Sequence, residues 1–116
     1  MKHIILIEDD DAIRDSLSIF FRGENIKITS YPDGRAVMTG DYSPPDLFLV
    51  DKQLPGMNGL DICRHLKTQP DSKDIPVIMI SARPGIIREA ESAGADDVLV
   101  KPCKLSVIRR VISRFL

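Results

Sequence analysis

The sequence predicts an α/β fold, a doubly wound five-stranded parallel sheet with helices on both faces. Short apolar runs rich in β-branched residues recur along the 116 residues, and segments with helical periodicity separate them. No repeat, linker or low-complexity segment interrupts this alternation. Strands that alternate with helices favour a parallel sheet, because each connecting helix crosses over one face of it. Residues 1–116 are therefore expected to form one domain.

Four of the apolar runs are continuous, which is typical of strands that are buried on both faces of a sheet. These runs are Ile4–Ile7, Leu47–Val50, Val77–Ile80 and Val98–Val100. The run Ile26–Thr29 alternates apolar and polar residues instead. It is predicted to be a less buried strand near an edge of the sheet.

Helices are predicted between the strands from apolar residues at helical spacing. Asp10 or Asp11 is placed to cap the first helix, and a short helix is expected from Arg35 to Thr39. A later helix spans Ile86 to Ala93 and ends at Gly94, a common C-terminal cap. The remaining apolar stripes are Ile13, Leu17, Phe20 and Phe21 in the first helix, Leu60, Cys63 and Leu66 in a helix that stops before Pro70, and Leu105, Ile108, Val111, Ile112 and Phe115 in the last helix.

Composition excludes several classes of protein. Hydrophobic residues make up 43% and charged residues 28%, with a formal net charge of -1, whereas disordered chains have fewer apolar residues and more net charge. No apolar run approaches the roughly 20 residues of a membrane helix, and the N-terminus lacks a signal-peptide pattern. We expect a cytoplasmic domain that contacts neither nucleic acid nor membrane directly. Cys63 and Cys103 have no metal-ligand spacing and are expected to be buried or half-buried free thiols.

The small net charge conceals an uneven distribution along the chain. Residues 8–11 are all acidic, whereas residues 101–116 contain basic residues and no acid. Arg109, Arg110 and Arg114 lack a helix-turn-helix pattern and interleaved aromatic residues, so they predict a solvated or partner-facing helix surface.

Polar residues stand where the apolar runs stop. Glu8 and Asp9 follow the first strand, Asp51 the third, Ser81 the fourth and Lys101 the fifth. The carboxyl ends of parallel strands share one edge of the sheet, and binding sites form there. We therefore expect these side chains to converge.

Three carboxylates at one edge repel one another unless a cation offsets their charge. Mg²⁺ suits Glu8, Asp9 and Asp51, because it takes oxygen ligands and is often shared with phosphate oxygens. Calcium would need more ligands, and neither histidine lies at a strand end, which disfavours softer metals. Acids near loops alternatively cap helices in solvent, and this interpretation is preferred for Asp10 and Asp11.

A carboxylate held beside a divalent cation can act as a nucleophile toward phosphorus, which is the role predicted for Asp51. The alternatives are a loop aspartate or a third metal ligand. Ser81 supplies a hydroxyl, and the small Ala82 lets a phosphoryl group approach, although serine alone is more often a turn residue. Lys101 is placed to pair with Asp51 at rest and with a phosphoryl oxygen afterwards, rather than to be an ordinary surface lysine.

Four stretches together resemble the receiver domain of response regulators, the phosphoacceptor domain of two-component signalling. They are Ile4–Asp10, Asp46–Gly59, Pro76–Ala82 and Gly94–Pro102, in family order and with near-family spacing. The resemblance covers nearly the whole chain and implies a flavodoxin-like sheet with strand order 2-1-3-4-5.

The resemblance also implies a role for each polar residue at the sheet edge. Asp51 would take a phosphoryl group from the phosphohistidine of a sensor histidine kinase or phosphotransfer protein, or from a small phosphodonor. Mg²⁺ would be held by Glu8, Asp9, Asp51 and the backbone carbonyl of Gln53. Ser81 and Lys101 would contact the oxygens of the phosphoryl group.

Phosphorylation would then switch a surface that a downstream effector protein or domain recognises. Assembly into a homodimer is a further alternative. The chain ends at Leu116, just after the last predicted helix. A stand-alone receiver and a receiver within a longer protein are both consistent with this, and either way the output is expected outside these residues.

Three departures from the family pattern lie near the expected output face. Val98 stands where many receivers have an aromatic residue, and Cys103 stands where phenylalanine is common. The interval from Ser81 to Lys101 is about two residues shorter than usual, with Arg83–Gly85 in the shortened loop. Output through the usual aromatic residue is therefore less expected than phosphoryl chemistry.

Three other functions fit this sequence less well than the receiver does. A pseudo-receiver that signals without phosphorylation usually lacks an acid, the acceptor or the lysine, and all are present here. A phosphatase of the haloacid-dehalogenase type needs a second aspartate two residues after its nucleophile, where this chain has Gln53. A flavodoxin is disfavoured because the acids after the first strand would repel the flavin phosphate.

Overall fold

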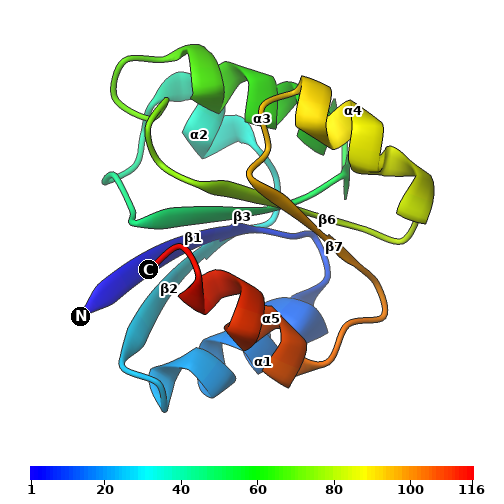
Figure 1. Cartoon of the computed structure of the whole chain (residues 1–116). Helices are drawn as coiled ribbons and strands as arrows, with labels where there is room; N and C mark the ends of the chain where they lie inside the picture. The colour runs from blue at the N-terminus through cyan, green and yellow to red at the C-terminus, as the bar shows by residue number, and fades with distance from the viewer.

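The computed structural model describes all 116 residues and contains the predicted parallel sheet between two layers of helices (Figure 1). The strand order is β2-β1-β3-β6-β7, which is the predicted order 2-1-3-4-5 with β6 and β7 as the fourth and fifth main strands. The strands are β1 (Lys2–Ile7), β2 (Ile26–Tyr31), β3 (Leu47–Asp51), β6 (Val77–Ser81) and β7 (Asp97–Val100).

The helices cover both faces of the sheet, as predicted. In Figure 1 α1 and α5 lie on one side of the sheet, and α2, α3 and α4 lie on the other. Their bounds are α1 (Asp11–Arg22), α2 (Arg35–Thr39), α3 (Gly59–Thr68), α4 (Ile87–Ser92) and α5 (Leu105–Ser113).

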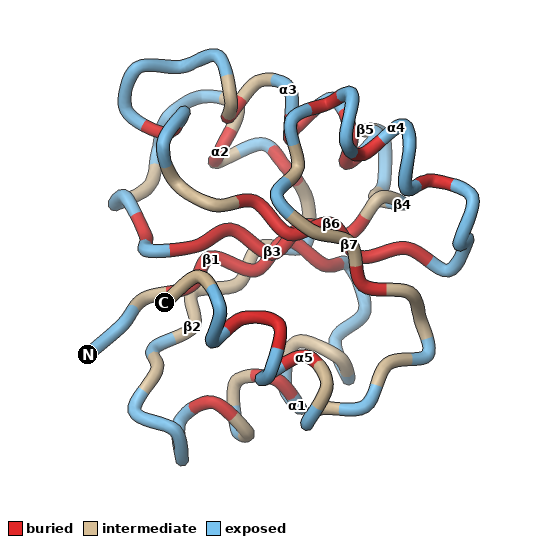
Figure 2. The backbone as a smooth tube through the Cα atoms, viewed as in Figure 1, coloured by how far each residue is buried: buried red, intermediate tan, exposed pale blue.

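Burial follows the pattern expected from the apolar runs. Every residue of β3 and β6 is buried, whereas the edge strand β2 is only partly buried, as its alternating sequence predicted (Figure 2). Alternate side chains of the central strands enter separate apolar clusters on the two faces, so that Phe48 packs with α3 while Leu49 packs with α1 and α5. The sheet is therefore anchored on both sides, and its polar carboxyl edge has a rigid support.

Local signals set several helix ends. The Asp10 side chain caps α1, accepting hydrogen bonds from the backbone N–H groups of Ala12 (2.9 Å) and Ile13 (3.2 Å). Asp11 is not the cap but the first residue of α1. Gly94 follows α4 with a φ of 93°, a left-handed conformation that favours glycine.

Two short elements were not predicted. A hairpin of β4 (Gln53–Leu54) and β5 (Met57–Asn58) lies between β3 and α3. A 3₁₀ turn, η1 (Pro84–Ile86), precedes α4, so the α-helix begins one residue later than predicted. Proline fits this first turn because its missing N–H is not needed there.

The free thiols and the basic helix agree with expectation. Cys63 is buried and Cys103 is half-buried, and neither forms a disulfide. Arg109, Arg110 and Arg114 are exposed on or beside α5. No helix is both long and apolar enough to cross a membrane.

Candidate functional site

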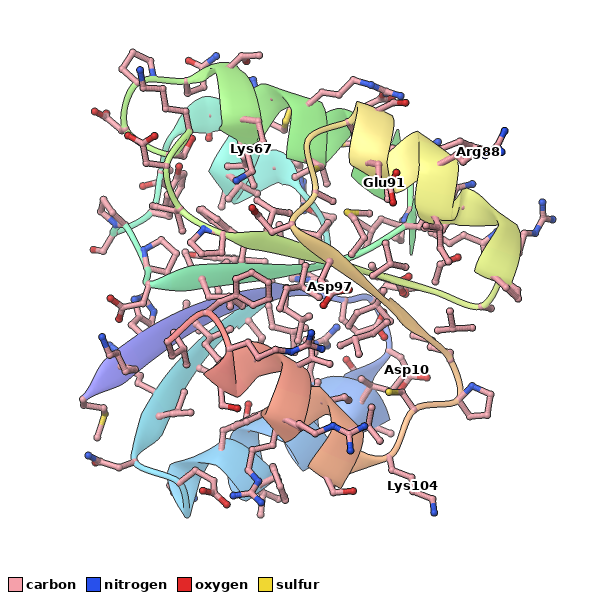
Figure 3. All side chains as sticks on the ribbon, in the orientation of Figure 1. Asp10, Lys67, Arg88, Glu91, Asp97 and Lys104 are labelled. Atoms are coloured by element: carbon pink, nitrogen blue, oxygen red, sulfur yellow. The ribbon has the colours of Figure 1, made fainter.

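The carboxyl ends of the strands bring all the predicted side chains to one edge of the sheet. Glu8 and Asp9 follow β1, Asp51 ends β3, Ser81 ends β6, and Lys101 follows β7. Figure 3 shows Asp10, just after β1, on the same side of the molecule as Lys104, which follows β7. The convergence predicted from the strand ends is therefore present.

Lys101 lies between two carboxylates. Its ammonium nitrogen is 2.6 Å from Oε1 of Glu8 and 3.0 Å from Oδ2 of Asp51. The contact with Asp51 was predicted, but the contact with Glu8 was not. A fully buried carboxylate requires a partner, so the position of Glu8 directly after a buried strand was the signal that could have identified it.

Burial strengthens the interactions among the charges of Glu8, Asp51 and Lys101. Burial and the neighbouring Asp51 raise the pKa of Glu8 to about 7, although Lys101 acts in the opposite direction. Burial alone would lower the pKa of Lys101, but its hydrogen bonds to Glu8 and Asp51 raise that pKa above its usual value. Lys101 is therefore a permanent ammonium at this edge.

The donor atoms suit a hard cation. Glu8, Asp9 and Asp51 can each offer a carboxylate oxygen, and these oxygens lie within 4.8 Å of one another. Glu8 and Asp51 are buried, whereas Asp9 is exposed, so the group is open on one side. An all-oxygen set that is open to water fits Mg²⁺ better than zinc or copper.

The loop after β3 holds the Asp51 carboxylate and borders an open hollow. The backbone N–H of Gln53 donates a hydrogen bond to Oδ1 of Asp51 at 3.2 Å. A hollow of about 470 Å³ lies between Asp9 and this loop, with Asn58 among its lining residues. The carboxyl edge is therefore open to solvent beside Asp9 and Gln53. The role of the Gln53 carbonyl stays a prediction.

Gly59 permits a close approach that sequence reasoning missed. A Cβ atom on Gly59 would overlap the backbone carbonyl oxygen of Asp51. The N–H of Gly59 also donates to the carbonyl oxygen of Lys52 at 2.8 Å. Glycine at the first position of α3 thus lets the helix start directly against the backbone of Asp51.

Ser81 ends β6, Val98 lies in β7 and Cys103 follows β7. The Ser81 hydroxyl oxygen accepts a hydrogen bond from the backbone N–H of Arg83 at 3.0 Å. Val98 is half-buried against the apolar cluster on the α3 face. Cys103 lines a largely apolar cavity of about 510 Å³ between α1 and α5, beside Lys101.

Several known proteins have sequences similar to this chain. The sequence model described as "Response regulator receiver domain" matches residues 4–113. Transcriptional regulatory protein CseB of Streptomyces coelicolor is 36% identical over 120 residues, which include 97% of this chain and 50% of that protein. DNA-binding response regulator MtrA of Mycobacterium tuberculosis is 35% identical over 118 residues, with the same shares. The chain thus spans about half the length of the curated relatives it matches.

Solved structures of receiver domains are also similar to this chain. The receiver domain of the sensor histidine kinase PA1611 from Pseudomonas aeruginosa, which holds a magnesium ion in its active-site cleft, is 26% identical with a TM-score of 0.86, covering 98% of this chain and 96% of that one. A histidine-kinase receiver domain from Syntrophus aciditrophicus is 32% identical with a TM-score of 0.89, covering 100% and 90%. With the sheet order and the match over residues 4–113, these similarities show that the chain belongs to the response regulator receiver domain family.

Proposed function

We propose that Asp51 accepts a phosphoryl group from the phosphohistidine of a sensor histidine kinase or a phosphotransfer protein. The observation that carries this proposal is the setting of Asp51: a carboxylate 5% exposed, 3.0 Å from an ammonium and grouped with two further carboxylates at an open edge. An ordinary aspartate in a loop would be exposed and would lack these charged neighbours.

In the proposed transfer, a carboxylate oxygen of Asp51 attacks the phosphorus atom of the donor. The bond between phosphorus and the imidazole nitrogen breaks, and its electron pair leaves with the imidazole. The Lys101 ammonium and the Ser81 hydroxyl then stabilise the oxygens of the transferred group. In the resting protein the same ammonium keeps Asp51 in place.

Glu8, Asp9 and Asp51, with the carbonyl of Gln53, are the residues proposed to hold Mg²⁺. When bound, Mg²⁺ would neutralise negative charge on the phosphoryl oxygens. The proposal is supported by the oxygen-only donor set and by the magnesium ion in the PA1611 receiver, a relative 26% identical.

The proposed consequence is a switch for a partner protein. A phosphoryl group adds negative charge and three acceptor oxygens, which would draw the Ser81 hydroxyl toward Asp51 and move the loop after β6. Because Val98 has no ring to reorient, this loop rather than an aromatic side chain is the proposed route of output. The receiver would act on a downstream effector protein or domain in the cytoplasm, without touching nucleic acid itself.

Intact-mass spectrometry tests the proposal directly. The protein is incubated with acetyl phosphate or phosphoramidate, with and without Mg²⁺. We expect a mass gain of one phosphoryl group that requires Mg²⁺ and disappears in Asp51→Asn. The control Asp74→Asn changes an exposed aspartate and should leave the gain intact.

Each rival function predicts a different outcome. A pseudo-receiver would gain no phosphoryl group, and an unchanged gain in Asp51→Asn would remove Asp51 from the chemistry. Sustained hydrolysis of phosphate esters would indicate a phosphatase, whereas the receiver should only lose its own phosphoryl group slowly.

A further inference from the structure

We propose that Arg14 is a positioning residue for the cation site, holding the loop that carries Glu8 and Asp9. This inference rests on the proposed Mg²⁺ site and adds a residue of α1 that neither binds the ion nor contacts the phosphoryl group. Its side chain is only 18% exposed, unlike the other arginines in ion pairs.

The guanidinium of Arg14 spans two acceptors. One nitrogen, Nη1, donates a hydrogen bond to the backbone carbonyl oxygen of Glu8 at 2.6 Å. The other, Nη2, forms an ion pair with the Asp11 carboxylate, one turn earlier on the same helix. Asp11 thereby orients the guanidinium, and the planar fork of arginine is suited to binding two acceptors at once.

The peptide group between Glu8 and Asp9 is consequently fixed at both ends. Its carbonyl accepts the hydrogen bond from Arg14, and its N–H, which belongs to Asp9, donates to Oε2 of Glu8 at 3.1 Å. The preceding N–H, that of Glu8, is held by the carbonyl oxygen of Tyr31 in β2 at 3.0 Å. Rotation of this one peptide group would move both carboxylates, so Arg14 acts on both proposed ligands at once.

Electrostatics and positioning predict opposite effects of removing Arg14. A nearby positive charge repels a cation, so its loss by itself would tighten Mg²⁺ binding. Loss of the carbonyl contact would free the Glu8–Asp9 peptide and weaken Mg²⁺ binding. Residues that orient metal ligands usually change metal affinity by about tenfold or more when they are replaced.

The experiment measures the Mg²⁺ dissociation constant by isothermal titration calorimetry for the wild type, Arg14→Gln and Arg14→Lys. We expect Arg14→Gln to weaken Mg²⁺ binding by about tenfold. Arg14→Lys keeps the charge but lacks the rigid planar fork of the guanidinium, so its dissociation constant should fall between those of the wild type and Arg14→Gln. Arg64→Gln is the matched control, because Arg64 forms the same i,i+3 ion pair with Asp61 (2.7 Å) on α3 and is 51% exposed.

A second measurement separates positioning from general destabilisation. Without metal, amide hydrogen exchange at Asp9 should be faster in Arg14→Gln than in the wild type, while exchange in β3 and β6 stays unchanged. If Arg14→Gln does not fold, the same measurements on Arg14→Lys take its place.

Unchanged or tighter Mg²⁺ binding in the variant would overturn the inference while the proposed function stands. A wild type that binds no Mg²⁺ would overturn both. A loss of affinity equal to that of Arg64→Gln would also overturn the inference, because the effect would then come from losing a surface charge pair.

Discussion

The strongest test of the charge arrangement is Lys101→Met, measured in metal-free buffer. Methionine keeps most of the volume of the lysine stem but removes the ammonium that contacts Glu8 and Asp51. Loss of the hydrogen bond to Asp51 should cost about 1.5 kcal/mol at any pH near neutrality. Glu8 adds a second cost that depends on pH.

The pH dependence follows from the raised pKa of Glu8. With a folded pKa of about 7 against an ordinary value of 4.5, the folded wild type binds the proton more tightly than the unfolded chain. Its stability therefore falls as the pH rises from 4.5 through 7. Without Lys101 the pKa of Glu8 moves higher still, and this fall continues above neutrality.

At about pH 6 Glu8 is largely protonated in both proteins, so most of the loss of stability comes from the contact with Asp51. At pH 8, one unit above the wild-type pKa of Glu8, the free energy of unfolding of the variant falls by a further amount of about 1 kcal/mol. This is the free energy of one pKa unit, reduced because solvent at the open edge screens the charges. The total loss is then about 1.5 kcal/mol at pH 6 and about 2.5 kcal/mol at pH 8.

Urea unfolding of both proteins at these two pH values, in the presence of a chelator, gives the comparison. Lys104→Met is the control, because Lys104 is exposed and three residues further along the chain. An equal loss at both pH values, or a loss no larger than that of Lys104→Met, would refute the coupling between Lys101 and Glu8.

The remaining predictions concern the thiols, one glycine and one histidine. Cys103 should react with a thiol reagent in the native protein, whereas Cys63 should react only on unfolding, because burial raises its pKa to about 11; equal rates would contradict this. Gly59→Ala should lower the free energy of unfolding by about 2 kcal/mol or more, because its methyl group would overlap a backbone carbonyl, while Gly85→Ala, with open space, should lower it far less. Burial holds the pKa of His3 below 6.5, so the contribution of His3 to stability should be lost as the pH falls below 6.5. His3→Gln should therefore make the free energy of unfolding depend less on pH on the acid side. An unchanged pH profile would contradict this.

The sheet could be predicted because its signals are local and repeated. The fully buried strands β3 and β6 are continuous apolar runs, and β2 alternates as an edge strand does. The ends of these runs were enough to bring Asp51, Ser81 and Lys101 to one edge. The sequence limited the N-terminal cap of α1 to Asp10 or Asp11. The backbone geometry shows that the cap is Asp10.

The details of the site could not be predicted because they depend on contacts between distant residues. Glu8 and Lys101 are separated by 93 positions in the sequence, and no local pattern pairs them. The overlap that excludes a side chain at Gly59 involves the backbone of another element. The β4–β5 hairpin has only two residues in each strand, too few for a periodic signal.

Chemical identification of the phosphorylated residue tests the central claim most directly. Borohydride reduction converts an aspartyl phosphate to homoserine, which peptide sequencing by mass spectrometry locates in the chain. After incubation with a small phosphodonor and Mg²⁺, we predict homoserine at position 51 and at no other aspartate, and none when Mg²⁺ is omitted. A phosphoryl group on a serine or histidine, or homoserine at another position, would contradict the account.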